Sequence, residues 1–227
     1  MPRIARCQPG GMVFHVLNRG NARMQIFDKP ADYDAFEKAM AQTAEHVEMR
    51  VLSYCLMPNH WHLLLRPRET GDLGRYMQRL TVTHVRRWHE HRHSTGGGHV
   101  YQGTYKSFPV QTDEHFLTVA RYVERNACRA NLVDKAQDWR WCSLWRRDHP
   151  ELVQDVPALA KWPVPCPPHW KRLVNRPQNQ KEVQALRAAV QRGRPFGSEH
   201  WQHQTANRLG LQSTFRPRGR PRKGEEQ

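Results

Sequence analysis

The stretch that decides the fold is SYCLMPNHWHLLLRP, residues 53–67. Its first half closes an apolar run at residues 50–57, and its second half is another run at residues 60–67, each with the length and composition of a buried strand. The pair Pro58-Asn59 between the two runs is typical of a tight corner. We therefore predict two successive strands joined by a short turn.

The segments on either side of this strand pair alternate between strand and helix periods. Upstream, residues 12–19 predict a strand, and residues 31–47 predict a helix whose apolar face holds Tyr33, Phe36, Met40 and Ala44. Downstream, we expect a helix at residues 71–91, a strand at residues 99–110, and a helix at residues 113–132 that is capped by Thr112. The order βαββαβα predicts an α+β fold, a ferredoxin-like antiparallel sheet with helices packed on one face.

The chain beyond this pattern differs in composition. Residues 151–227 hold 14 basic and 6 acidic residues, a denser positive charge than in residues 1–150. We therefore place a domain boundary near residue 150, between a main domain and a basic, partly disordered C-terminal extension. Its Pro-rich start, residues 162–170, is expected to be a linker or an extended strap rather than a packed element, and residues 182–211 could hold two short helices.

The extension ends in the motif Pro217-Arg218-Gly219-Arg220-Pro221. This motif resembles the core of an AT-hook, in which an extended Arg-Gly-Arg enters a narrow minor groove. A plain basic tail that binds any phosphate backbone has the same composition. Phosphate binding is expected in either case.

Composition restricts the partner and the compartment. The chain carries 36 Lys and Arg against 21 Asp and Glu, a formal charge of +15, which indicates a polyanionic partner, with nucleic acid ahead of a membrane surface. No apolar stretch approaches the roughly 20 residues of a membrane-spanning helix, and the start lacks the apolar core of a signal peptide. The five cysteines are scattered without a CxxC pair, which favours reduced thiols. We expect a cytoplasmic, nucleoid-associated protein.

The most informative tripeptide is His60-Trp61-His62. On a strand, His60 and His62 point to one face and Trp61 to the other, so the two imidazoles could form half of a metal site. On the last predicted helix, Tyr122 and Asn126 lie one turn apart on the same side, and the amide oxygen could complete a site with open positions for phosphate and water. The residues alone also fit a chance His-x-His pair in a chain with 14 histidines, beside a half-buried core tyrosine.

Four motifs, in this order, resemble those of the REP-associated tyrosine transposases, which belong to the single-tyrosine HUH transposases. They are HVLNRGNARMQIF at residues 15–27, the stretch at residues 53–67, HVYQGTYKSF at residues 99–108 and RYVERNACRANLV at residues 121–133. Four motifs at sensible spacing are far more specific than any one of them. The tail is also similar to the C-terminal extension of some members.

The resemblance implies a metal-dependent DNA transposase that cuts and rejoins single-stranded DNA beside REP-type palindromic hairpins. It puts the metal ligands at His60, His62 and Asn126, for Mg²⁺ or Mn²⁺, and the nucleophile at Tyr122, which would form a 5′-phosphotyrosine. The family usually has Asn-Pro where this chain has Asn126-Ala127. A proline would weaken the helix there, so this departure bears on how Asn126 is presented.

Basic residues near these positions predict a track for DNA phosphates. The candidates are Arg19, Arg23, Lys106, Arg121, Arg125, Arg129, Arg218 and Arg220. Two other functions stay open at this point, a metal-dependent phosphodiesterase without a covalent intermediate and a non-catalytic, domesticated protein that binds hairpin DNA. The sequence is compatible with a monomer and with a homodimer.

Overall fold

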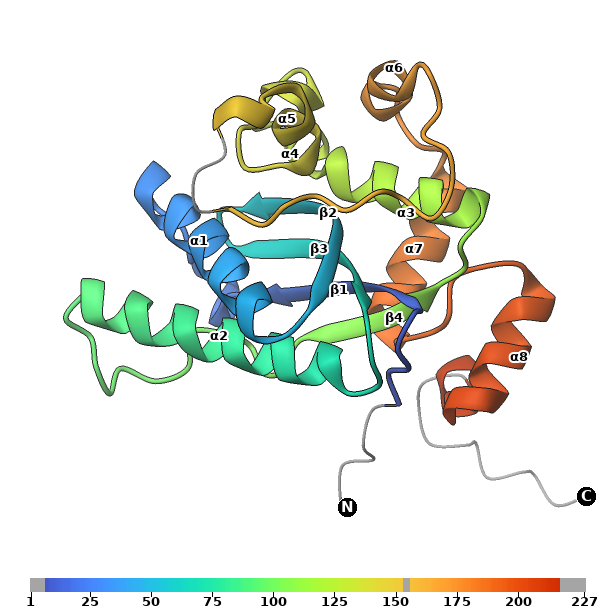
Figure 1. Ribbon diagram of the computed structural model, residues 1–227, viewed down its shortest axis with the longest axis horizontal. Helices are drawn as coiled ribbons and strands as arrows, with labels where there is room; N and C mark the ends of the chain where they lie inside the picture. Colours follow the sequence, from blue (N-terminus) through green and yellow to red (C-terminus); the bar gives the residue numbers. More distant parts are fainter. Residues whose placement is uncertain (1–6, 153–155, 217–227) are drawn as a thin grey trace, which may run out of the picture.

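The computed structural model describes residues 7–152 and 156–216. Four strands form one antiparallel sheet in the order β2-β3-β1-β4 (Figure 1). The strands are β1 (Val13–Arg19), β2 (Met49–Met57), β3 (His60–Pro67) and β4 (Lys106–Val110). The antiparallel pairing and the order of strands and helices confirm the predicted ferredoxin-like α+β fold.

The strand pair β2–β3 forms as the sequence predicts. Met57 pairs with His60 across the two-residue corner, and the backbone N–H groups of Ile26 and Phe27 both donate to the carbonyl of Pro58. The corner is therefore held by the chain that follows β1. Because the corner is fixed, so is the start of β3, where the His-x-His tripeptide lies.

Helices α1 (Pro30–His46) and α2 (Asp72–His91) pack against each other and against one face of the sheet, which we call the Trp61 face (Figure 1). Phe36 and Met40 of α1 are fully buried there, as their helical spacing predicts. Trp61, Leu63 and other alternate strand residues complete this core. The period of two along each strand thus supplies the apolar surface that the two amphipathic helices cover.

Helices α3 (Glu114–Glu124) and α4 (Asn126–Arg129) cover the opposite face, which we call the His62 face (Figure 1). The expectation that the helices pack on one face is therefore wrong for the last predicted helix. The reason is that Leu64 and Phe108 make this second face apolar as well, so it also needs a cover. Phe116 and Val123 of α3 are fully buried against it.

Two predicted boundaries differ from the structure. Strand β4 begins at Lys106 and not at residue 99, because residues 99–105 form a loop in which Gly103 has a φ of +149°, a conformation that favours glycine. Helix α3 is capped by Asp113 and not by Thr112, since the Asp113 carboxylate accepts a hydrogen bond from the backbone N–H of His115. The helix also breaks at Arg125, which separates α4 from α3.

The remaining elements lie after α4 or within loops. They are the helices α5 (Ser143–Asp148), α6 (Trp170–Asn175), α7 (Gln180–Arg192) and α8 (Glu199–Leu209), and the 3-10 turns η1 (Asn21–Arg23), η2 (Ala136–Asp138), η3 (Pro150–Leu152) and η4 (Gln212–Phe215). In the described residues, no helix has the length and apolar character needed to span a membrane.

The Pro-rich stretch at residues 162–170 is a strap that packs along strand β2. Just before it, the backbone N–H of Ala160 donates to the Val51 carbonyl, and Trp162 donates its indole N–H to the Leu52 carbonyl. The expectation that this stretch is not a packed element is therefore wrong, because Trp170 is buried in the core of the His62 face and Trp162 packs against that core.

The two short helices predicted in residues 182–211 are α7 and α8. Helix α7 buries Leu186 and Ala189 against β4 and α3, and Phe196 exchanges backbone hydrogen bonds with Pro109 and Gln111 at the end of β4. The extension thus packs back onto the sheet domain. The boundary near residue 150 stays a prediction, and the AT-hook-like residues 217–221 lie outside the described part of the chain.

Candidate active site

A cavity of about 580 Å³ opens on the His62 face, where β1, β3 and β4 meet α3, α4 and α7. It brings together all four residues for which the sequence predicts chemistry: His60, His62, Tyr122 and Asn126. The other lining residues are Leu17, Asn18, Arg19, Gln102, Gly103, Thr104, Lys106, Arg129, Arg187, Val190 and Gln191. The lining therefore holds four cationic side chains and no carboxylate.

The two histidines are oriented through their Nδ1 atoms. The Nδ1 of His60 lies 2.6 Å from Oδ1 of Asn59, and the Nδ1 of His62 lies 2.9 Å from Nε2 of His15. Since an amide oxygen only accepts, His60 must donate from Nδ1, which leaves the lone pair on its Nε2. When His62 likewise donates from Nδ1 to His15, its Nε2 also carries a lone pair. Partners of this kind orient metal-ligating histidines.

Burial keeps these imidazoles neutral. It lowers the pKa of His60 to about 3, with smaller contributions from the charges of Arg19 and Arg129. Burial likewise lowers the pKa of His15 to about 3 and holds the pKa of His62 well below its usual range. Neutral imidazole is the form that ligates metal ions, so the pair is in a metal-competent state at neutral pH.

Tyr122 lies directly beside the histidines. Tyr122 is 8% exposed, and the ring centroids of Tyr122 and His62 are 5.7 Å apart in an edge-on arrangement. The guanidinium carbon of Arg129 is 3.9 Å from the centroid of the Tyr122 ring. The phenol is thus held between an imidazole and a cation at the cavity wall.

Asn126 is the first residue of α4 and is 5% exposed. Its Oδ1 accepts a hydrogen bond of 2.6 Å from Arg129, and its Nδ2 has no partner among the described residues. The contact with Arg129 fixes which end of the amide is the oxygen, because two donors would repel each other. Arg129 therefore touches both Tyr122 and the predicted third ligand.

Glu124 anchors this part of the chain, although the sequence did not single it out. Its side chain is fully buried, and its carboxylate accepts hydrogen bonds from Ser53, Ser143, Trp170 and Arg147. These partners come from β2, α5 and α6, so one carboxylate ties the end of α3 to three other elements. His15 was missed as well. In both cases the available signal was a polar residue inside or beside an apolar stripe.

The predicted DNA-binding residues divide into three groups. Arg19, Lys106 and Arg129 line the cavity. Arg121 and Arg125 do not, because both donate to the carbonyl of Arg176, in the loop between α6 and α7. Arg23, in the turn after β1, also lies outside the cavity lining, while Arg218 and Arg220 lie beyond the described residues.

A second cavity, of about 700 Å³, adjoins the first and shares Asn18, Gly103 and Thr104 with it. Its wall runs along α2 and the loop at residues 98–105 and includes the side chain of Val82, which is 53% exposed. The cavity is mainly apolar. The two cavities thus form neighbouring hollows of different character, one cationic and one apolar.

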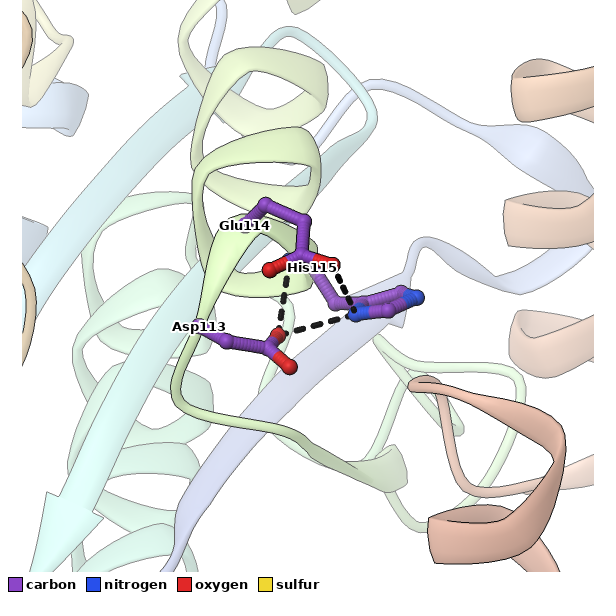
Figure 2. A group of neighbouring side chains, drawn as sticks. All are labelled: Asp113, Glu114 and His115. Carbon is purple, nitrogen blue, oxygen red and sulfur yellow. Dashed lines mark hydrogen bonds and ion pairs between the residues drawn. The ribbon is translucent and has the colours of Figure 1, made fainter.

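Another cluster of possible ligand atoms lies at the start of α3 (Figure 2). Asp113, Glu114 and His115 gather there, with His115 Nδ1 2.8 Å from Asp113 Oδ1. The same Asp113 oxygen accepts the backbone N–H of His115 and so caps the helix. None of the three lines the cavity described above, and helix capping accounts for their arrangement.

Comparison with known proteins is consistent with this geometry. Residues 10–126, just over half of the chain, match the family model described as Transposase IS200 like. The match spans all four strands and ends at Asn126. The fold and the matched region define a protein of the DNA transposase class. The chain belongs to the IS200-like transposase family.

One curated relative and one solved structure agree with the predicted resemblance. A protein of Haemophilus influenzae with the provisional name REP-associated tyrosine transposase is 23% identical over 133 residues, which cover 55% of this chain and 76% of the relative. A solved structure of a REP-associated tyrosine transposase bound to a REP hairpin superposes with a TM-score of 0.54 and 17% identity, over 70% of this chain and 92% of the other. A provisionally named transposase of Deinococcus radiodurans gives a TM-score of 0.38 at 20% identity, over 55% of this chain and 96% of the other.

Proposed function

We propose that this chain is a metal-dependent endonuclease and strand transferase that cleaves and rejoins single-stranded DNA beside palindromic hairpins. The observation that carries the proposal is the single cavity that holds two neutral histidines, a tyrosine and an amide together with four cations. Phosphodiester transfer needs a nucleophile, stabilisation of charge on the non-bridging oxygens, and cations that position the polyanion. The names of the relatives support the same reaction and the hairpin as substrate.

Tyr122 is the proposed nucleophile. Its phenolic oxygen attacks the scissile phosphorus, the bond between phosphorus and the tyrosine oxygen forms, and the bond to the 3′ oxygen breaks. The phenolic proton passes to water, and the departing 3′ oxygen takes up a proton to become a hydroxyl. The product is a 5′-phosphotyrosine, and attack by another 3′-hydroxyl restores a phosphodiester without a nucleotide cofactor.

The residues of the cavity fit a divalent cation, Mg²⁺ or Mn²⁺. His60 and His62 would hold it through Nε2, and Asn126 through Oδ1, whose second lone pair remains beside the contact with Arg129. When bound, such a cation supplies Lewis-acid stabilisation of the phosphate oxygens. Around it, Arg129 keeps the Tyr122 ring and the Asn126 amide in fixed orientation, while Arg19 and Lys106 bind the flanking backbone.

The adjoining apolar cavity supports a single strand as the substrate. In a duplex the bases are stacked and paired inward, whereas an unpaired base can turn away from its phosphate and bury its face against apolar side chains. A phosphate in the cationic cavity would have such a hollow next to it. The paired bases of double-stranded DNA could not enter the apolar cavity in this way.

Formation of a covalent adduct tests the proposed function. The protein is incubated with single-stranded oligonucleotides that carry a palindromic hairpin, with and without Mg²⁺ or Mn²⁺, and is analysed on denaturing gels. We expect a metal-dependent protein–DNA adduct that Tyr122→Phe abolishes, while hairpin binding survives because the phosphate contacts remain. Cleavage without an adduct would indicate a phosphodiesterase that activates water. Binding without cleavage would indicate a non-catalytic hairpin-binding protein.

A further inference from the structure

Helix α7 belongs to the extension, beyond the residues that match the transposase family, yet it forms part of the wall of the catalytic cavity. Arg187, Val190 and Gln191 of this helix line the same cavity as His60 and Tyr122. The family match ends at Asn126. The side chains that α7 supplies therefore lie outside the region that matches the family model.

Helix α7 is held in this position by its own buried residues and by contacts of the chain just before and just after it. Leu186 and Ala189, which lie near Arg187 in the sequence, are buried in the core and are 0% and 2% exposed. Arg121 and Arg125 of the α3–α4 segment donate to the carbonyl of Arg176, just before α7. After α7, Phe196 pairs with the end of β4. Arg187 is thus presented at the cavity by a docked helix rather than by a mobile tail.

The positive charges that line this cavity favour the binding of an anion. Arg187 and Arg129 line the same cavity. With Arg19 and Lys106 in the same lining, four cations face one space without a carboxylate among them. Like charges that line one cavity repel each other, and an anion bound between them offsets this repulsion. The anion that this cavity receives under the proposed function is a DNA phosphate.

We propose that Arg187 and Arg129 together form a phosphate-binding site for the DNA backbone next to the scissile phosphate, so that the extension is a part of the active site. The inference rests on the proposed function for the identity of the ligand. A guanidinium offers several N–H donors in a planar fork that matches phosphate oxygens. Arg129 comes from the core that carries Tyr122, and Arg187 comes from the extension, so the phosphate would be held from both sides.

The test uses the full chain and three variants. Arg187→Ala removes the charge at the cavity, and Arg187→Lys keeps it but loses the planar fork. Lys181→Ala removes the same charge from an exposed position at the start of α7, outside the cavity, and serves as the matched control. Thermal melting of all three checks that the helix stays docked.

We expect Arg187→Ala to weaken binding of the single-stranded hairpin substrate about tenfold and to reduce the slope of log affinity against log salt by about 0.7. Arg187→Lys should retain the slope and lose part of the affinity. Lys181→Ala should leave cleavage unchanged. An unchanged affinity and slope in Arg187→Ala would overturn the proposal.

Oligonucleotides in which a neutral methylphosphonate replaces one phosphate at a time identify the phosphate that Arg187 and Arg129 bind. In the wild-type protein, one linkage beside the scissile position should cost about tenfold in affinity, and the same linkage should cost clearly less in Arg187→Ala, where Arg129 alone remains to bind the phosphate. A merely structural role of Arg187 would lower affinity equally for every oligonucleotide, and that result would also overturn the proposal. Because this readout is binding, it separates the two hypotheses: absence of the adduct in the wild-type protein contradicts the proposed function alone.

Discussion

The two faces of the sheet use the same strands for different purposes. On the Trp61 face, the indole N–H of Trp61 donates to the hydroxyl of Tyr101, which is in turn hydrogen-bonded to His84, so these buried polar groups satisfy one another. On the His62 face, Nδ1 of His15 and Nδ2 of Asn126 have no partner among the described residues. A buried polar group without a partner costs about 1–3 kcal/mol. Asn126 lines the candidate site, and His15 is hydrogen-bonded to His62 of that site.

The contrast is sharpest within one tripeptide. Trp61 is fully buried under α1 and α2, whereas His60 and His62 open onto the cavity beneath α3, α4 and α7. A period of two along the strand is sufficient to separate the two roles. Stability and chemistry can therefore be changed independently at neighbouring positions, and this independence can be tested.

The largest effect is expected on the His62 face. His62→Ala should reduce metal-dependent cleavage at least about a thousandfold, because a site with one imidazole loses most of its Lewis-acid stabilisation, which is worth several kcal/mol. Affinity for hairpin DNA should change little, since it depends mainly on basic residues. Single-turnover cleavage and fluorescence anisotropy measure the two quantities. Wild-type cleavage in His62→Ala, or in the presence of EDTA, would contradict the metal assignment.

Trp61→Ala is the matched change on the opposite face. It should mainly lower stability, whereas His62→Ala should mainly lower cleavage. Removing a fully buried indole leaves a cavity, which typically costs about 3–5 kcal/mol of unfolding free energy. Urea denaturation should show this loss, whereas His62→Ala should cost less, about 1–3 kcal/mol, because it leaves buried His15 without its hydrogen-bond partner. Equal destabilisation by both substitutions would show that the two faces do not have separate roles.

These contrasts also explain what could be predicted from the sequence. The strand pair at residues 53–67 and helices α1 and α2 follow from local periods, and the pairing of His60 with His62 needs only the geometry of a strand. Tyr122 and Asn126 could be set beside each other from their spacing. Their approach to the histidines followed from the family resemblance and not from any local pattern.

The parts that escaped prediction depend on contacts between distant segments. His15 reaches His62 only because β1 pairs with β3, and Glu124 is satisfied by groups from β2, α5 and α6. Arg187 reaches the cavity only because α7 docks on β4 and α3. A single sequence carries no local signal for such contacts. The prediction that all helices pack on one face of the sheet was wrong for α3 for the same reason.

The next prediction uses a buried carboxyl on the Trp61 side. Burial raises the pKa of Glu37 from 4.5 to about 7, against smaller opposing effects of its hydrogen bond with Tyr54 and the charge of Arg146. Because the folded pKa is the higher one, the stabilising contribution is fully present below about pH 4.5 and is lost as the pH rises through about 7. Its full size is about 3 kcal/mol.

Glu37→Gln removes this titration, so the unfolding free energy of the variant relative to the wild type should rise between pH 5 and 8. Chemical denaturation at several pH values measures it. The control is Arg187→Lys, which should keep the wild-type pH dependence because both side chains stay charged in this range. An identical pH profile in Glu37→Gln and wild type would show that Glu37 does not titrate in this range.

The smallest effect is expected at Ala127, where the related family has proline. Helix α3 already ends before this residue, with the break at Arg125, and Ala127 is the second residue of α4, a first-turn position where proline is tolerated. We therefore expect Ala127→Pro to change the unfolding free energy by less than about 1 kcal/mol and to leave cleavage within about twofold of wild type. Ala120→Pro is the control, since it lies inside α3 and should cost about 3 kcal/mol or more. Denaturation and adduct formation measure both variants. If Ala127→Pro instead raised cleavage strongly, the alanine would be presenting Asn126 poorly, and the contact between Asn126 and Arg129 would be the first feature to re-examine.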